Sequence, residues 1–231
     1  MAQYRIGTSD PTIVPDVGAG AWNSEPTTIE MRANKAGIIA SMAVAYVVIG
    51  DDATRHMAHY LHTSGRDLTI DLQGLLDDVP NEKALYETEL GEAKRFVQGL
   101  SEGTHQITSA RASGGYIRQG EDTNWYFAVG GYSAWGKGEA TVSRNASGQR
   151  AYSLNFEYKF FDRYNWDGKK SVNFHGIVVT DEFMGRFHRE GLAQEFNMYG
   201  SVTHRVNWGA APSYVPTVPG VGGRNYTGAR N

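Results

Sequence analysis

The sequence predicts an α+β protein, in which about three N-terminal helices pack on a C-terminal antiparallel β-meander that carries one late helix. Apolar residues recur with helical spacing up to about residue 103 and alternate with polar residues from residue 105 onward. Glycine (28 residues) and aromatic residues (12%) are abundant, which favours turn-rich antiparallel sheet over a helical bundle. A chain of 231 residues is also long enough to bury a substantial core.

Composition excludes several classes of function. The net charge of −3 and the interspersed charges give no basic face, so nucleic acid is not an expected partner. The chain has no cysteine, which excludes disulfides and thiolate catalysis. No apolar stretch of a signal peptide follows Met1, so export would require a carrier or a dedicated machine.

Changes in composition divide the chain into four regions. We expect an irregular N-terminal arm over residues 1–26 and a helical subdomain over residues 27–103. An antiparallel sheet with a helix at 181–198 should occupy residues 104–208. Residues 209–231, rich in Pro and Gly and without periodicity, should form a flexible tail.

The first predicted helix begins at the capping box Thr27–Glu30 and ends before Gly50. Its second half, residues 36–49, carries no charge. A membrane-spanning helix needs about 20 apolar residues, so this run is short for one. The pattern therefore predicts a core helix buried on nearly all sides and no transmembrane helix. The alternative is a segment that inserts into a membrane.

The second predicted helix, capped by Asp51 or Asp52, carries three histidines at steps of three: His56, His59 and His62. Two imidazoles one turn apart can share a metal ion. No carboxylate stands at ligand spacing within this helix. These residues are therefore weak metal candidates, and the alternative is ordinary surface or helix-end histidines.

The remaining elements follow from shorter patterns. Residues 67–72 predict a strand, one helical turn should end at Pro80, and a longer helix should run from Asn81 to about Leu100. Alternation then predicts strands around 106–110, 115–118, 124–129, 132–135, 139–144, 152–160, 171–179 and 201–208, with a hairpin turn at 145–148.

A candidate site lies at the end of the 152–160 strand. Asp162 and Tyr164 continue the face of that strand which carries its aromatic residues, and Asp167 adds a second carboxylate in the turn. A carboxylate at a strand end backed by aromatic rings can be desolvated yet reachable. The alternative is an ordinary polar turn whose charges Lys169 and Lys170 neutralise.

The helix after this turn adds further candidates. Thr180 should cap it, and Asp181 suits its first turn. His188 lies at the edge of the apolar side and has Arg189 beside it, so the pair could serve as acid or base and anion contact. The alternative is a histidine bonded to a backbone carbonyl between helix and sheet.

Residues 124–200 resemble the C-terminal domains of bacterial polymorphic toxins in three segments: 125–131, 161–168 and 187–196. More loosely, the chain resembles the colicin M group of bacteriocins, whose signature is Asp-x-Tyr-Asp followed by His-Arg. Asp162 and Tyr164 match the start of that signature, and His188 with Arg189 matches its end. Asn165 stands where the family has its second Asp, unless Asp167 takes that place.

The resemblance implies an antibacterial toxin that hydrolyses a phosphate ester or pyrophosphate link in a cell-envelope lipid precursor, with a divalent cation (Mg or Ca). It implies a lipid-linked phosphate substrate, an immunity protein or secretion carrier as partner, and a bacterial protein that is exported or delivered by a carrier. The alternative is a non-enzymatic toxin, or a structural or binding module that docks to a carrier or a membrane.

Overall fold

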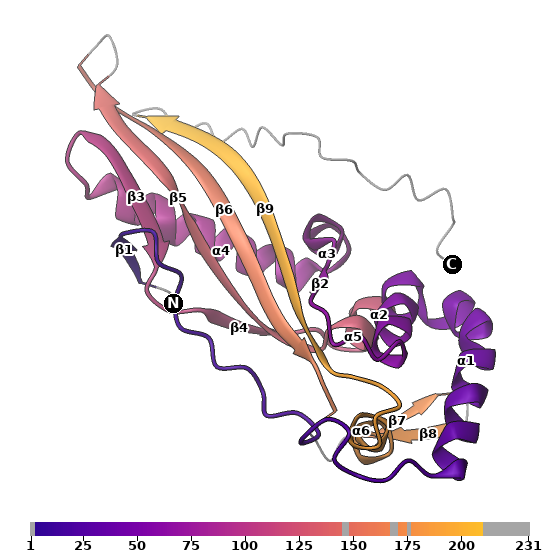
Figure 1. Cartoon of the computed structure of the whole chain (residues 1–231). Helices are drawn as coiled ribbons and strands as arrows, with labels where there is room; N and C mark the ends of the chain where they lie inside the picture. The colour runs from indigo at the N-terminus through magenta and orange to yellow at the C-terminus, as the bar shows by residue number, and fades with distance from the viewer. Residues whose placement is uncertain (1–2, 145–147, 167–170, 175–176, 210–231) are drawn as a thin grey trace.

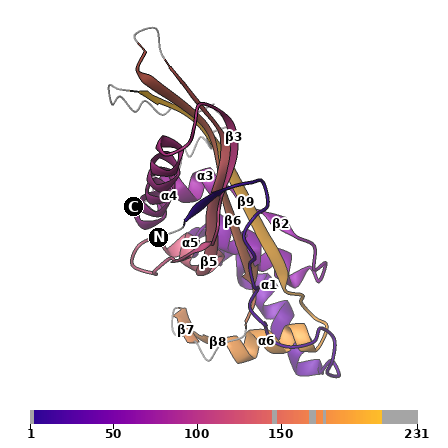
Figure 2. The same cartoon turned by 90° about the vertical axis from the view of Figure 1, so that its left-hand side faces the viewer.

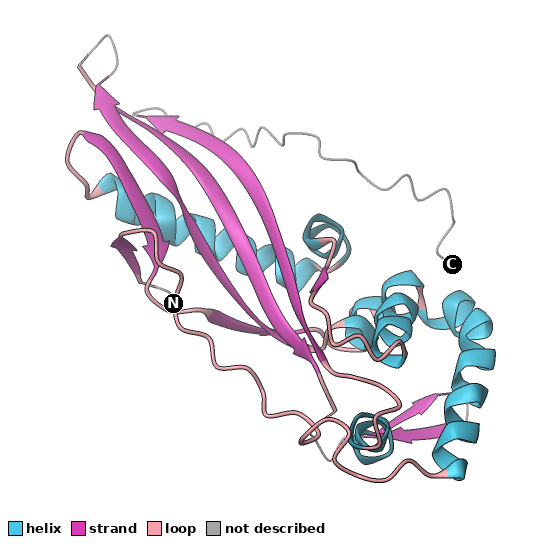
Figure 3. Cartoon of the chain, viewed as in Figure 1, coloured by secondary structure: helices cyan, strands magenta, loops and turns pink. Residues whose placement is uncertain are grey.

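The computed structural model describes residues 3–144, 148–166, 171–174 and 177–209, and it confirms the α+β class (Figures 1 and 3). The helices are α1 (Ile29–Ile49), α2 (Asp51–Leu61), α3 (Leu72–Asp78), α4 (Pro80–Gln98), α5 (Thr123–Ala128) and α6 (Asp181–Arg189). The strands are β1 (Tyr4–Ile6), β2 (Leu68–Thr69), β3 (Gly103–Ser109), β4 (Ser113–Tyr116), β5 (Gly131–Arg144), β6 (Arg150–Tyr164), β7 (Ser171–Phe174), β8 (Ile177–Thr180) and β9 (Phe196–Gly209).

A long twisted sheet organises the molecule, with strand order β1-β3-β5-β6-β9-β2 and β4 paired to the start of β5. Its centre is antiparallel: β6 pairs with β5 from Arg150 to Phe161 and with β9 from Ala151 to Tyr164. Only β2 runs parallel to its neighbour, β9, within the described sheet. The β5–β6 pairing agrees with the predicted hairpin, although residues 145–147 of its turn lie outside the described residues.

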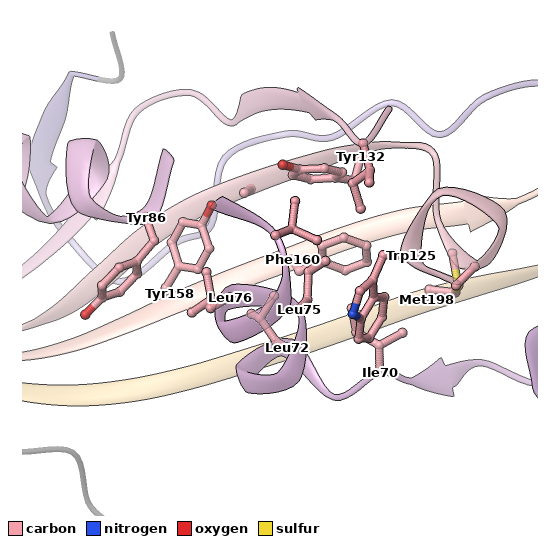
Figure 4. Packing of buried hydrophobic residues seen from close by; sticks show 14 of the residues in the cluster. Ile70, Leu72, Leu75, Leu76, Tyr86, Trp125, Tyr132, Tyr158, Phe160 and Met198 are labelled. Carbon is pink, nitrogen blue, oxygen red and sulfur yellow. The ribbon is translucent and has the colours of Figure 1, made fainter. Parts of the chain in front are cut away.

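Alternation along β6 builds the core. Leu154, Phe156, Tyr158 and Phe160 are each at most 1% exposed. Figure 2 shows α3 and α4 over one face of the sheet. Successive side chains of a strand point to opposite faces, so one face of a strand can be wholly apolar. In Figure 4, Tyr158 and Phe160 of β6 lie beside the leucine side chains of α3, and Tyr86 of α4, Trp125 of α5 and Tyr132 of β5 complete the cluster.

The N-terminal arm is part of the sheet at its beginning. β1 pairs with β3, and the Tyr4 hydroxyl donates a hydrogen bond of 3.1 Å to Glu89 on α4. The arm then runs along the body to the end of the molecule where α6 lies (Figure 1). It reaches α1 there, so the first and last thirds of the chain meet.

Three predicted strands differ from the structure. Residues 124–129 form the short helix α5, because the Asp122 side chain caps it by accepting from the Trp125 amide at 2.8 Å. The run 171–179 forms the separate hairpin β7–β8 rather than a strand of the main sheet. The strand predicted at 67–72 is reduced to β2, since Asp71 caps α3 immediately afterwards.

The late helix is shorter than the predicted range 181–198. α6 begins as expected, with the Thr180 hydroxyl accepting from the Phe183 amide at 3.0 Å, but it ends at Arg189. Gly191 has φ +69°, which is the left-handed conformation. A helix commonly ends at such a residue, and glycine adopts this conformation without strain. The chain then turns back and enters β9 at Phe196, five residues earlier than predicted.

The first helix departs most from expectation. Gly50 ends it as predicted, but its cap is Thr28, whose hydroxyl accepts from the Met31 amide, and the Thr27 hydroxyl instead donates to the Glu190 carbonyl. The predicted burial of residues 36–49 is wrong. Met31 is the only residue of α1 that is buried, and Val44 and Val47 are 63% and 81% exposed. Among the described residues, α1 is the one helix long and apolar enough to cross a membrane by length and composition.

Candidate functional site

The predicted acidic strand end lies in the seam between β6 and β9. Asp162 and Tyr164 are opposite Met198 and Phe196 and are 9% and 7% exposed. The Tyr164 ring stacks on Phe196 with centroids 5.1 Å apart, and burial raises the pKa of its hydroxyl well above the ordinary value. Tyr164 is therefore a neutral packing residue in this structure, while Asp162 is a carboxylate at the margin of the core.

The predicted acid–base histidine has both ring nitrogens occupied. Nδ1 of His188 accepts a hydrogen bond of 3.1 Å from the Glu195 backbone amide, and Nε2 donates one of 3.1 Å to the Gly20 carbonyl. The side chain is 4% exposed. The structure thus matches the alternative expectation, in which the histidine bonds a backbone carbonyl between helix and sheet. Neither ring nitrogen faces solvent or a cleft, as an acid or base would require.

Arg189 is likewise already paired. Its Nε lies 2.7 Å from Glu25, a second guanidinium nitrogen contacts Glu182, and a third is 3.3 Å from the Ala19 carbonyl. The side chain is 18% exposed. Two carboxylates thus neutralise the cation, and Arg189 attaches α6 to the N-terminal arm.

The residue at the centre of this region is Glu195, which is not among the candidates that the sequence indicates. Its side chain is fully buried, and Oε1 accepts from the amides of Ala19 at 2.8 Å and Trp166 at 3.1 Å. Oε2 accepts from Arg163 at 3.3 Å. Glu195 therefore joins the arm, the end of β6 and the loop after α6. The sequence signal for a buried Glu195 is Gly191, which ends the helix. Once the helix ends there, Glu195 no longer belongs to the solvent-exposed face of a helix.

A second missed acid, Glu190, joins α6 to α1. Its Oε2 accepts from the Thr28 amide at 2.8 Å, and Oε1 accepts from Arg186 at 2.9 Å. Burial by itself would raise the pKa of this carboxyl, but the Thr28 amide and the Arg186 guanidinium stabilise the carboxylate and hold the pKa below its ordinary value. The start of α1 is thus fixed directly to the helix that carries His188.

The carboxylates predicted to converge with His188 are only partly described. Asp181 is half-buried in the first turn of α6, and Asp167 lies outside the described residues. Two hollows, of about 480 and 350 Å³, lie on the sheet, and neither is lined by Asp162, Asp181 or His188. Convergence of these acids around one cleft therefore stays a prediction.

The three histidines within residues 56–62 have separate surroundings and do not converge on one metal position. His56 is fully buried and donates from Nδ1 to the Ala128 carbonyl at 2.7 Å, and its burial lowers its pKa to about 4. His59 donates from Nε2 to the Arg66 carbonyl at 2.7 Å, and His62 is exposed at the end of the helix. In the part of the chain that the structure describes, no three His, Cys, Asp or Glu side chains gather as a metal site.

The two halves of the resemblance, in contrast, do come together. Residues 161–166 and 187–196 are separated by the β7–β8 hairpin in sequence, yet Tyr164 pairs and stacks with Phe196, and Arg163 and Trp166 both bond Glu195. Figure 1 shows the end of β6, α6 and α1 at the same end of the molecule.

No family profile matches the chain, and no curated protein matches it. Two solved structures do. One is truncated syringacin M from Pseudomonas syringae pv. tomato DC3000, with 16% identity, a TM-score of 0.30 and coverage of 69% of this chain and 60% of that one. The other is PaeM from Pseudomonas aeruginosa, a colicin M-like bacteriocin, with 16% identity, a TM-score of 0.33 and coverage of 69% and 51%.

Both are bacteriocins. The comparison thus agrees with the resemblance found in the motifs, and the match spans only 60% and 51% of the two bacteriocins' own lengths. At TM-scores of 0.30 and 0.33 the likeness assigns no residue role and no activity to this chain.

Proposed function

We propose that this chain is an antibacterial toxin of the bacteriocin kind that acts in the bacterial cell envelope. One observation carries the proposal. Residues 162 and 164 and residues 188 and 189 match the two ends of the colicin M signature, and the segments that contain them, 161–166 and 187–196, pack together around Glu195. A motif whose halves are distant in sequence gains meaning when the segments that contain them meet in the fold.

The chemistry proposed for this region is hydrolysis of a phosphate ester or pyrophosphate link in a lipid-linked envelope precursor. Asp162 would be the catalytic carboxylate, which orients or deprotonates the attacking water, with Asp167 as a second acid. His188 and Arg189 would be positioning residues, since their bonds to Gly20, Glu195, Glu25 and Glu182 hold the arm and the loop beside the strand end.

A divalent cation belongs to the activity that the resemblance implies. The described residues do not form a donor set for one, because no three acidic or histidine side chains gather within them. Activity would be measured with Mg²⁺, with Ca²⁺ and with a chelator, so that a requirement is read directly.

The test compares production of the protein in two cellular compartments and uses one isosteric substitution, Asp162→Asn. The chain is produced in a bacterial host either in the cytoplasm or behind an export signal, and only the exported form is expected to kill. Asp162→Asn should abolish killing and cleavage of purified lipid-linked pyrophosphate while leaving the unfolding midpoint close to that of the parent. Glu157→Gln, a carboxylate change on the same strand, is the control and should remain fully active.

Two results would reject the proposal. An exported, folded chain that does not harm the host is not an envelope toxin. A chain that kills without cleaving the substrate, and that kills equally well as Asp162→Asn, is a non-enzymatic toxin or a binding module that docks to a carrier or a membrane. The observation that favours this second candidate is the exposed apolar helix α1. Delivery by a carrier and neutralisation by an immunity protein belong to either form of the proposal.

A further inference from the structure

The helix α1 has a narrow side that contacts the protein. Ile38, Met42 and Ile49 pack against the core, and Ala45 between them is half-buried. At about 100° per residue these positions fall within roughly 60° of the helix circumference. The spacing is that of a single seam, so the body of the protein covers one thin stripe of α1.

The rest of the helix is apolar and open. Ile39, Val44, Tyr46, Val47 and Val48 are between 43% and 81% exposed, and they spread over an arc of roughly 200° on the side away from the seam. Ten of the fourteen residues from 36 to 49 are exposed, and none of the fourteen is charged. A helix that is apolar around its circumference is normally enclosed by protein or by lipid.

The width of this arc identifies what covers it. A second protein surface or a second copy of the chain typically covers a stripe of about 100° on a helix, which would leave much of the open arc in water. Hydrocarbon has no such limit, because acyl chains surround whatever is inserted. The residues that could provide charge complementarity to a protein partner are also missing, since Glu30, Arg32 and Lys35 all precede the open stretch.

The length of the open stretch decides between crossing and lying flat. Fourteen residues rise about 21 Å, less than the roughly 30 Å of a bilayer core. The start of the helix is also tied down: Lys35 donates to the Leu192 carbonyl at 2.7 Å, and Thr28 bonds Glu190. α1 therefore suits the boundary between headgroups and acyl chains, with the body of the protein taking the place of a polar helix face.

We propose that the open face of α1, defined as residues 39, 44, 46, 47 and 48, is a lipid-binding surface on which the protein rests on a bilayer. The same contacts that fix α1 to the loop after α6 would hold the end of β6 beside that bilayer. The idea that this surface brings a toxin to its lipid-linked substrate rests on the proposed function. The binding of α1 to lipid does not depend on that function.

The test exploits the absence of cysteine in the chain. Val47→Cys is labelled with an environment-sensitive dye, and Val17→Cys is the control, because the two valines are 81% and 86% exposed and only the first is on α1. On addition of phosphatidylcholine vesicles, the label at 47 should shift to the blue and be quenched by quenchers carried on the acyl chains. The label at 17 should not respond.

Paired substitutions measure the strength of the contact. Val44→Asp with Val47→Asp should weaken partition into the same vesicles by at least about 100-fold, since each valine contributes about tenfold. Val17→Asp should leave partition unchanged, and helical content is checked by circular dichroism. Binding should be nearly the same at low and at high salt, because the surface has no charge to be screened.

The vesicles contain no lipid-linked pyrophosphate, so this test fails or succeeds independently of any hydrolysis. A label at 47 that does not respond to lipid overturns the proposal. A label at 47 that shifts without lipid as protein concentration rises, together with sedimentation as a dimer, would assign the surface to a second copy of the chain instead.

Discussion

The backbone amide of Glu195 donates a hydrogen bond of 3.1 Å to Nδ1 of His188, seven residues earlier. This bond fixes the tautomer of the imidazole, so that Nε2 carries the proton that it donates to Gly20. The histidine that the sequence marks as an acid or base is thereby a link between α6, the loop after it and the N-terminal arm.

Replacement of this histidine should act first on stability. His188→Ala leaves the Gly20 carbonyl and the Glu195 amide unpaired in a buried place, and we expect it to lower the free energy of unfolding by about 1–3 kcal/mol. His62→Ala, at an exposed histidine, should change it by no more than about 0.5 kcal/mol. Urea unfolding measures both. If His188→Ala keeps the parent stability but loses killing, the imidazole has a chemical role after all.

The charge of Glu195 should matter separately from its shape. Glu195→Gln keeps an oxygen for the Ala19 and Trp166 amides but turns an NH₂ group toward Arg163, so two donors face each other in a buried site. We expect a loss of about 1–3 kcal/mol in the free energy of unfolding and faster proteolysis of the arm. Glu157→Gln on β6 serves as the control. An unchanged midpoint for Glu195→Gln would mean that Arg163 is not held by this carboxylate.

Gly18 should be intolerant of any side chain. Its φ is +77°, and a Cβ there would lie 2.1 Å from Oε2 of Glu195, which its three partners prevent from moving away. Gly148 has nearly the same φ, +76°, with nothing within 4 Å, so Gly148→Ala carries the backbone strain without the clash. We expect Gly18→Ala to be the less stable variant by about 1–3 kcal/mol. Equal thermal midpoints would show that the arm is not pressed against Glu195.

The contributions of Glu82 and His56 to the free energy of unfolding should change with pH in opposite directions. Burial raises the pKa of Glu82 to about 7, although Tyr158 donates to it at 2.8 Å, and burial lowers the pKa of His56 to about 4. The folded state therefore binds more protons at Glu82 between about pH 4.5 and 7, where its contribution falls as pH rises. At His56 the unfolded state binds more protons between about pH 4 and 6.5, where its contribution rises with pH.

Glu82→Gln should separate these two contributions. It removes the contribution of Glu82 that falls with pH, so the stability of the variant relative to the parent should increase between about pH 4.5 and 7, and at pH 8 the variant should exceed the parent by about 3 kcal/mol at most. Glu92→Gln, at a more exposed carboxylate on the same helix, is the control. A parent and a Glu82→Gln variant with parallel curves across this range would show that Glu82 is ionised in the folded protein.

Local chemistry was enough to predict much of the framework. Alternating aromatics in β6 predicted its buried face, the Thr180 and Gly50 signals predicted the start of α6 and the end of α1, and the α+β class followed from the change of period. Each of these depends on neighbours in sequence: side-chain alternation, a cap hydroxyl within three residues, or a glycine at a positive φ. The same alternation predicts that Asp162 and Tyr164 lie at the end of this strand.

Burial and partnership were decided by tertiary structure alone. The uncharged run of α1 has the composition of a core helix, but the sheet packs against α3 and α4 instead and leaves α1 outside. His188 and Glu195 have ordinary sequence surroundings, and their roles come from Gly20, Ala19 and Arg163, which are distant in the chain. Sequence determines which groups are able to pair or to be buried, but only the folded chain brings distant groups within the 3 Å or so over which hydrogen bonds act.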